Sequence, residues 1–547
     1  MPARKFLLPI AVPLTGLMVA TGCSGSDGTE KSDPPTTKAG GSSGAPQTGG
    51  RLVKEGWFGS ADGLRARVEI KGLERQGAKS VLRYAVTSMD SAAKSVPFGV
   101  TLLDPVGRKL YRPTGTPAGG GGAGAPAGGA STPTDGASTP AGGASTPAGG
   151  ASTPAAPAAP AAAPAPVQFA PGATQELTAD FPPIPSNVQK VTVITTGTAG
   201  EFTGVPVTGT GPAPAGDQPA PAPAGDQPAP DGPADANANP ADLYDITEGE
   251  IKDVTSSGSD VKMNLRTDVL FDFDSAKLSG RAKQVLDQAA QEIREKADPG
   301  KRPLTINGHT DSKGADDYNL KLSRERAEAV QKELQNRLGT TFRYSAHGKG
   351  EAELIAKEGG SDDAKARSRN RRVEISYVVR QQTAGATGTS TAAADGRGGT
   401  VQPAAFRAQD GKTVASRFGR FAGAKRRLDV KPFYRDGAYL VAVFELVNEG
   451  PGTTPPDAAY PHKDYLGGAF TSFSVLLPGG TDVYRAVRIG APAANSATYV
   501  DPGRAVFRTA VNEPVRGFVY IPAPPGNPST VVFDGGPFGK TNNVPVS

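Results

Sequence analysis

Apolar positions follow two different periods between residues 262 and 380. Short β-type apolar runs predict strands at 263–273, 304–308, 342–347 and 372–379. Apolar residues three or four positions apart predict two helices, one capped by Ser279 and one starting near Ser323. Their apolar faces are Ala282, Val285, Leu286, Ala289 and Ile293 in the first helix, and Ala327, Val330, Leu334 and Leu338 in the second.

The first helix should end at Asp298-Pro299-Gly300 and the second at Gly339, because proline and glycine stop helices. The order of elements is then β-α-β-α-β-β. It predicts an α+β domain with its helices on one face of a mixed sheet.

The regions on either side of this domain show alternating strand patterns broken by Gly, Pro and Asp, without a helical period. They also resemble each other, since residues 67–86 align without gaps to 427–446. Weaker similarities join Phe98–Arg112 to Phe473–Arg485, Pro171-Gly172 to Pro502-Gly503, and Phe202–Val207 to Phe538–Val546. We expect two related antiparallel β-sandwiches of the immunoglobulin-like type, at 51–208 and 400–547.

Several tracts are too rich in Gly, Ala, Pro and Thr to form a core. Residues 114–166 fall inside the first sandwich, where the second copy has only a short connection, so we interpret them as an insertion. Residues 209–240 and 381–399 read as linkers on both sides of a central domain at 241–380. Units separated by such linkers are expected to unfold independently.

The N-terminus has the pattern of an export signal. Arg4 and Lys5 precede an apolar run from Phe6 to Ala20, which is too short for a comfortable membrane span. Cys23, the only cysteine, follows small residues in Ala20-Thr21-Gly22 and resembles a bacterial lipobox. We expect cleavage after residue 22, lipidation of Cys23, and a flexible tether at 23–50. An ordinary signal peptide with a coincidental cysteine is the alternative.

The composition limits the other function classes. A net charge of +5 in 547 residues, with no basic stripe between aromatics, gives no support for a nucleic-acid partner. The three histidines have no metal-ligand spacing, and the S-x-x-K at Ser91–Lys94 lacks its partner motifs. We therefore expect neither an enzyme, nor a metal, nor a cofactor.

Four motifs of the central region carry a family resemblance. They are Phe271-Asp272-Phe273-Asp274-Ser275, Gly308-His309-Thr310-Asp311, the run Asn319–Val330 that fits N-x-x-L-S-x-x-R-A-x-x-V, and Asn370-Arg371-Arg372-Val373. In this order they resemble the OmpA-like peptidoglycan-binding domain, over about a fifth of the chain. The resemblance implies binding to the diaminopimelate of the peptidoglycan stem peptide, which carries a free carboxylate and a free ammonium.

The resemblance assigns this binding to Asp311, Asn319 and Arg326. Arg326, expected in the first turn of the second helix, would hold the carboxylate beside free helix N–H groups. Asp311 would accept the ammonium, and Asn319 would add an amide hydrogen bond. Arg371 is a further candidate, although one of Arg371 and Arg372 must face away, and His309 is expected to be structural.

Two functions fit this arrangement. In the first, a lipid-anchored, exported protein binds peptidoglycan non-covalently and tethers the membrane to the wall. The membrane would be the cytoplasmic one, or the outer one in a Gram-negative host. In the second, the sandwiches bind another envelope protein and wall binding only positions them. The preferred diaminopimelate isomer is not determined by the sequence.

Overall fold

The computed structural model describes residues 51–59, 63–115, 118–119, 166–211, 239–301, 303–360, 362–380, 402–421, 423–452, 454, 458–490, 497–507 and 510–547. The signal segment, Cys23, the tether, most of the insertion at 114–166, most of the 209–240 linker and the whole 381–399 linker lie outside the described residues.

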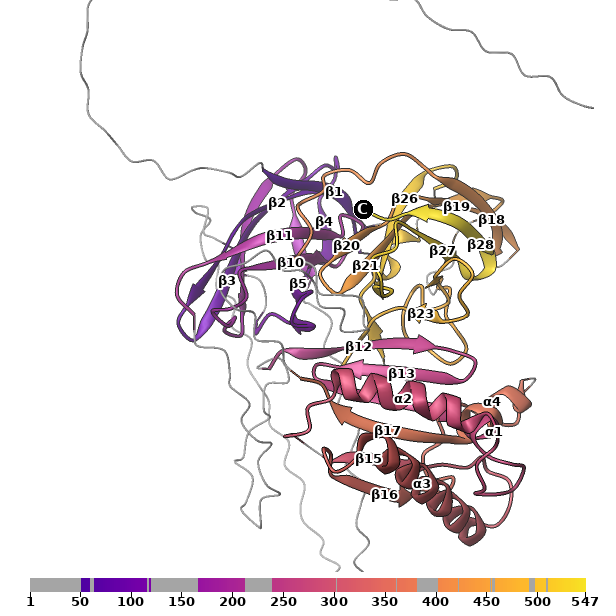
Figure 1. Ribbon diagram of the computed structural model, residues 1–547. Helices are drawn as coiled ribbons and strands as arrows, with labels where there is room; N and C mark the ends of the chain where they lie inside the picture. The colour runs from indigo at the N-terminus through magenta and orange to yellow at the C-terminus, as the bar shows by residue number, and fades with distance from the viewer. Residues whose placement is uncertain are drawn as a thin grey trace, which may run out of the picture. The chain divides into compact units, whose positions relative to one another are not determined.

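Within the described residues, the α-helices all belong to the central region (Figure 1). Its elements are β12 (Ala241–Glu248), β13 (Lys252–Ser257), β14 (Asp260–Arg266), α1 (Thr267–Leu270), α2 (Ala282–Lys296), β15 (Leu304–Gly308), α3 (Asp316–Leu338), β16 (Tyr344–Gly348), α4 (Asp363–Asn370) and β17 (Arg372–Val378).

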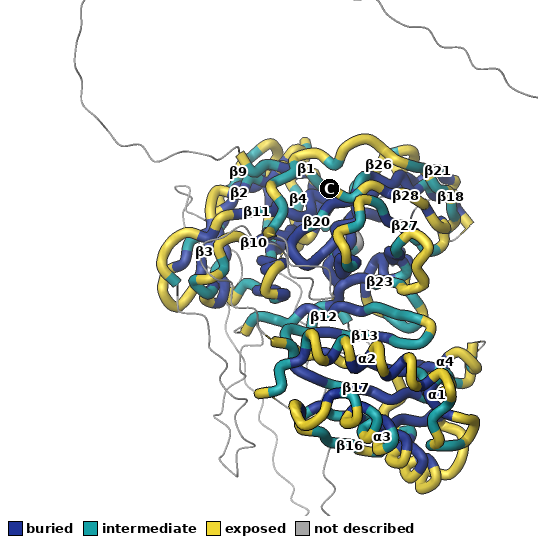
Figure 2. Tube along the Cα trace, in the orientation of Figure 1, coloured by how far each residue is buried: buried dark blue, intermediate teal, exposed yellow. Residues whose placement is uncertain are grey.

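Strand β17 lies between β14 and β15, antiparallel to both, and β16 continues the sheet as a parallel neighbour of β15. Helices α2 and α3 lie on one face of this mixed sheet (Figure 1). The predicted α+β arrangement is confirmed for this region. The apolar faces of both helices pack with Met263, Ile306 and Ile375 in one core, and β17 is buried along its length (Figure 2).

Three local predictions were wrong. The predicted strand 263–273 ends at Arg266, and Thr267–Leu270 form the single helical turn α1. The second helix begins at Asp316 rather than near Ser323, because Asp316 and Asp317 place two carboxylates at the positive end of the helix dipole. Ser279 accepts a hydrogen bond from the N–H of Ala282 at 3.2 Å, but the residue at the N-cap position of α2 is Arg281 rather than Ser279 as predicted.

In the first flanking region, the described part of residues 51–211 has strands as its regular elements. They are β1 (Leu52–Phe58), β2 (Leu64–Gln76), β3 (Lys79–Ser88), β4 (Lys94–Pro97), β5 (Val100–Asp104), β6 (Lys109–Tyr111), β7 (Ala118–Gly119), β8 (Pro166–Phe169), β9 (Thr174–Phe181), β10 (Lys190–Thr195) and β11 (Glu201–Thr208). One series pairs as β1-β2-β3-β9 and a second as β11-β10-β5-β6. Side chains from both series share a core.

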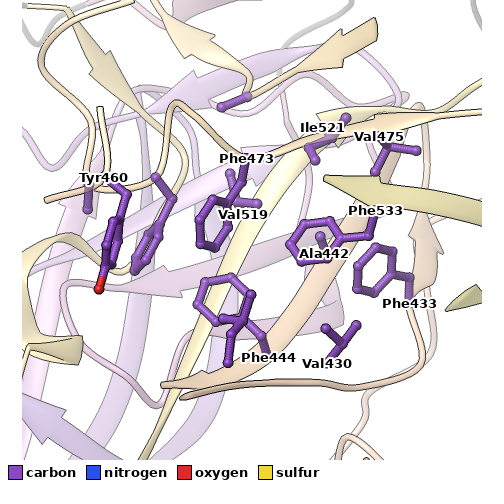
Figure 3. Packing of buried hydrophobic residues seen from close by; sticks show 14 of the residues in the cluster. Val430, Phe433, Ala442, Phe444, Tyr460, Phe473, Val475, Val519, Ile521 and Phe533 are labelled. Carbon is purple, nitrogen blue, oxygen red and sulfur yellow. The ribbon is translucent and has the colours of Figure 1, made fainter. Parts of the chain in front are cut away.

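The second flanking region, residues 402–547, repeats this pattern. Its elements are β18 (Ala415–Phe421), β19 (Ala424–Val430), β20 (Tyr434–Asp436), β21 (Tyr439–Gly450), β22 (Ser474–Leu476), β23 (Val483–Arg485), β24 (Arg488–Ile489), β25 (Thr498–Tyr499), η1 (Gly503–Val506), β26 (Pro514–Pro522), β27 (Thr530–Asp534), η2 (Gly536–Phe538) and β28 (Lys540–Pro545). Its core includes Phe433, Phe473 and Phe533, whose rings meet edge to face (Figure 3).

The two copies agree in strand register. Ile70 lies opposite Tyr84, and their counterparts Val430 and Phe444 are also opposite each other. Between the paired strands, Gly77 and Gly437 both have positive φ, at 65° and 59°, a conformation that favours glycine. The predicted internal repeat is therefore present in the pairing itself, while its immunoglobulin-like class stays a prediction.

The strand register corrects two of the weaker alignments. In the turn before β9, Gly172 has a φ of 62°, and in the turn before β26 the residue is Asn512, with a φ of 63°. The counterpart of Gly172 is therefore Asn512 rather than Gly503. Similarly, Phe202 lies opposite Val193 as Thr541 lies opposite Phe533, so Phe538 is not the counterpart of Phe202.

Strand β12 joins the three regions. It pairs with β13 of the central sheet, with β6 of the first copy, and with β23 and β24 of the second copy. Leu243 of β12 is fully buried in a cluster with Leu110 and Val441, which come from different copies. The independent units expected from the linkers are thus connected, and residues 51–547 form one compact unit.

Candidate functional site

Two glycines bring α3 against the ends of β15 and β16. A Cβ atom on Gly308 would lie 1.9 Å from the carbonyl oxygen of Ser323, and one on Gly348 would lie 2.6 Å from that of Leu320. Ser323 is fully buried, and its hydroxyl accepts a hydrogen bond from the N–H of Gly350 at 3.0 Å. This close packing places the predicted motif residues of α3 beside the loop that follows β15.

Asp311, Arg371 and Asp268 form a chain of ionic hydrogen bonds. Arg371, directly after α4, donates to Asp311 at 2.7 Å and to both carboxylate oxygens of Asp268 at 2.9 and 2.7 Å. These hydrogen bonds raise the pKa of Arg371 further above its usual range. Burial alone would raise the pKa of Asp268, but the hydrogen bonds from Arg371 and Ser368 outweigh it and lower that pKa. Asp268 is therefore ionised at neutral pH.

Arg326 lies in the third turn of α3, and not in the first turn as predicted, because the helix begins at Asp316. It is 5% exposed, and its Nε donates to the carbonyl of Ser275 at 2.9 Å. Its guanidinium also lies over the ring of Phe271, 5.4 Å from the centroid. Burial lowers the pKa of Arg326, partly offset by the nearby charges of Asp274 and Asp268. Free helix N–H groups therefore do not assist this arginine.

The terminal nitrogens of Arg326 are what distinguish it from Arg371. Among the described residues, no carboxylate forms a salt bridge with Arg326, and the hydrogen bond that it donates to Ser275 uses Nε. The Nη pair is consequently available as a fork for a planar anion. Arg371, by contrast, already holds two carboxylates.

Asn319 is 3% exposed in the first turn of α3. Its amide nitrogen donates to the carbonyl of Lys313 at 3.0 Å and to Glu351 at 2.8 Å. The side chain thereby holds the loop that carries Asp311. This arrangement gives Asn319 a positioning role, while its direct contact with a ligand remains a prediction.

Arg372 and His309 lie on the side of the sheet away from this cluster. Arg372 is 2% exposed, and burial lowers its pKa to about 10. His309 is 1% exposed, and burial together with the charge of Arg372 lowers its pKa to about 3. A neutral, enclosed imidazole fits the structural role that was expected for it.

The sequence reasoning missed the residues that support the cluster. Asp268 went unnoticed because Thr-Asp-Val-Leu reads as strand. Glu358 also went unnoticed; it accepts hydrogen bonds from Ser312 at 2.6 Å and from Asn370 at 2.7 Å. It also pairs with Arg367 of α4. The acidic pair at Asp316-Asp317 was the available signal for the true start of α3.

None of the helices in the described part of the chain has the length and apolar character to cross a bilayer. Cys23 lies outside these residues, so its predicted lipidation stays an expectation.

The comparisons with known proteins agree with the geometry. Residues 270–371 match the model of the OmpA family. Outer membrane protein A of Bordetella avium is 38% identical over 117 residues, which are 21% of this chain and 57% of that protein. The "Probable lipoprotein YiaD" of Escherichia coli is 33% identical over 135 residues, covering 25% of this chain and 59% of that protein.

A solved structure also matches this region. The structure of the peptidoglycan-associated lipoprotein from Burkholderia pseudomallei is 31% identical in sequence to this chain. The alignment covers 20% of this chain and 88% of the lipoprotein chain, with a TM-score of 0.17. The chain spans 57% and 59% of the lengths of the two curated relatives. The similarity is therefore limited to part of each protein. Residues 270–371, with the cluster of Asp311, Arg326 and Arg371, form an OmpA family domain.

Proposed function

We propose that the central domain binds peptidoglycan non-covalently, by holding the zwitterionic end of diaminopimelate in the stem peptide. The observation that carries the proposal is the buried Arg326, anchored through Nε to Ser275 while its Nη fork lacks a carboxylate partner among the described residues. A buried guanidinium whose Nη groups contact no carboxylate is costly, because the nearby charges of Asp274 and Asp268 offset its burial only in part, and a ligand carboxylate would supply that contact.

The other half of the cluster has the opposite charge. Asp268 and Asp311 share the single guanidinium of Arg371, which leaves one negative charge in excess. Each carboxylate oxygen has a second lone pair, so Asp311 can accept from an ammonium without losing Arg371. A ligand with one carboxylate and one ammonium matches this pair of subsites, and we expect binding without chemical change.

We further propose that this binding tethers a membrane to the wall. The names of two similar proteins place them as an outer membrane protein and a lipoprotein. In this chain a diacylglyceryl group on Cys23 would provide the membrane end. Mass spectrometry of the native protein should find that group, and the Cys23→Ala chain should move from the membrane to the soluble fraction.

The decisive experiment for wall binding is sedimentation of the purified full chain with insoluble peptidoglycan. The wild type should pellet, and Arg326→Ala and Asp311→Ala should each remain in solution. Arg324→Ala is the matched control, since Arg324 is an exposed arginine on the same helix, two residues away. It should pellet like the wild type.

The folded state of each variant should be checked by circular dichroism. A wild type that stays in solution would refute wall binding. Equal pelleting of all four proteins would show that the assigned residues do not form the site.

A further inference from the structure

A second cluster of cations lies in the second flanking copy, away from the OmpA family domain. The hairpin of β18 and β19 borders a hollow of about 400 Å³. The hollow is lined by Phe418, Gly419, Arg420, Lys425, Arg426 and Glu449.

Arg426 is the unusual member of this lining, because it is 1% exposed and lacks a described acidic partner. Its guanidinium donates to Asn448 Oδ1 at 2.6 Å, to the carbonyl of Lys425 at 2.9 Å and to the hydroxyl of Thr454 at 3.2 Å. All three acceptors are uncharged. Such burial of a guanidinium costs free energy that a bound anion would offset.

The rim of the hollow adds positive charge. Arg420 and Lys425 are exposed and form no ion pair with any described residue. Arg427, two residues from Lys425 on the same face of the hairpin, pairs with Glu449 at 2.8 Å and with Asp429 at 3.0 Å. The lining of the hollow holds three cations, Arg420, Lys425 and Arg426, and one carboxylate, Glu449, which leaves an excess of two positive charges.

The first copy shows that the fold does not require these residues. The strand register makes Ala66 the counterpart of Arg426 and Glu55 the counterpart of Phe418. In that copy Glu55 pairs with Arg67 at 2.9 Å and lies 3.9 Å from Arg65. In the first copy a carboxylate thus occupies the position that Phe418 has in the second copy, and it offsets part of the positive charge of that hairpin.

We infer that the β18–β19 hairpin of the second copy is a binding site for a phosphate group. A phosphate monoester carries a charge close to −2, which matches the excess, and its oxygens suit the planar fork of arginine. Phe418, whose side chain is 66% exposed at the edge of the hollow, offers an apolar surface to the organic part of the ester. This site is independent of the proposed peptidoglycan site.

The test uses the mature chain from residue 23 with Cys23→Ala, so that no acyl chain on this residue can insert into a bilayer. Two probes separate the sources of phosphate: inorganic phosphate followed by calorimetry, and vesicles of phosphatidic acid, whose headgroup is a phosphate monoester, compared with phosphatidylcholine vesicles. The proposal expects binding of at least one probe at low ionic strength. The double variant Arg420→Ala/Lys425→Ala should weaken that binding at least tenfold.

Two further variants complete the experiment. Arg426→Met should also weaken binding at least tenfold, and its thermal unfolding should be compared with that of the wild type to separate binding from stability. Arg65→Ala, at the counterpart of Lys425 in the first copy, should bind like the wild type.

The results with the two probes support or overturn the phosphate site as follows. Binding of free phosphate supports a soluble ester as the ligand, and binding of anionic vesicles alone supports a lipid headgroup. Failure of both probes would overturn the inference. Equal binding by the wild type and the double variant would also overturn it.

Discussion

Arg371 donates two hydrogen bonds to Asp268, at 2.9 and 2.7 Å, and these orient its guanidinium so that it donates a third hydrogen bond to Asp311. Asp268 comes from α1 and Arg371 follows α4, so this pair closes the cluster from two elements that the sequence patterns did not predict. It makes Asp268 a positioning residue for the proposed site.

We expect Asp268→Ala to weaken peptidoglycan binding about tenfold without unfolding the protein. Without Asp268, Arg371 would neutralise Asp311 alone, and the excess negative charge that attracts the ammonium would be lost. Asp268→Glu should restore most of the binding, because it keeps the charge. Sedimentation with peptidoglycan measures both variants, and an unchanged affinity of Asp268→Ala would refute the positioning role.

Gly308→Ala should destabilise the central domain by about 3 kcal/mol or more. Its new Cβ would lie 1.9 Å from a backbone oxygen of α3, so the helix would have to move away from β15. Gly280→Ala is the control, since nothing lies within 4 Å of its added Cβ. Urea unfolding compares the two, and a stability of Gly308→Ala close to the wild type would contradict this packing.

The stability of the protein should fall in acid through Glu248 of β12. Burial alone would raise the pKa of Glu248, but the charges of Arg485 and Arg369 outweigh it and lower that pKa to about 2. A carboxyl with a lowered pKa stabilises the fold above its ordinary pKa, near 4.5, and this contribution is lost as the pH falls through about 2.

Glu248→Gln should therefore cost up to about 3 kcal/mol at pH 7, and less at pH 3. Urea unfolding at the two pH values measures the difference. Glu250→Gln, at an exposed position two residues away, should change neither value. An equal loss for Glu248→Gln at both pH values would exclude its charge as the cause.

Calorimetry should show one main unfolding transition for residues 51–547, because β12 pairs with strands of all three regions. Leu243→Asp should split that transition, since it places a charge in the shared cluster. Separate transitions in the wild type would show that the three regions unfold independently.

The sequence predicted the elements whose pattern is local. The apolar faces of α2 and α3 and the strands β15 and β17 followed from periodicity, and Asp311, Arg326 and Arg371 lie in one region as the motifs implied. The start of α3 was missed because its first turns bury polar side chains, including Asn319 and Ser323, in place of an apolar stripe. Hydrophobic periodicity cannot detect a buried helix face that is made of polar side chains.

The contacts made by β12 could not be predicted for a different reason. Its partners β6 and β23 lie more than 100 residues away on either side, and an alternating strand carries no signal of which edge it will meet. The equivalence of the two copies was detected in the sequence. The sequence did not show that the two copies would pair the same edge, through β6 and β23, with the single strand β12.

The pairing of β12 also bears on solubility. Strands β6 and β23 are bounded on one side by β5 and β22, and on the other by β12. Unpaired strand edges are templates for aggregation. A single short segment thus shields two such edges at once, because a fragment that begins after Glu248 would expose β23, and a fragment that ends before Ala241 would expose β6. Attempts to produce the flanking copies separately should keep Ala241–Glu248 with each of them.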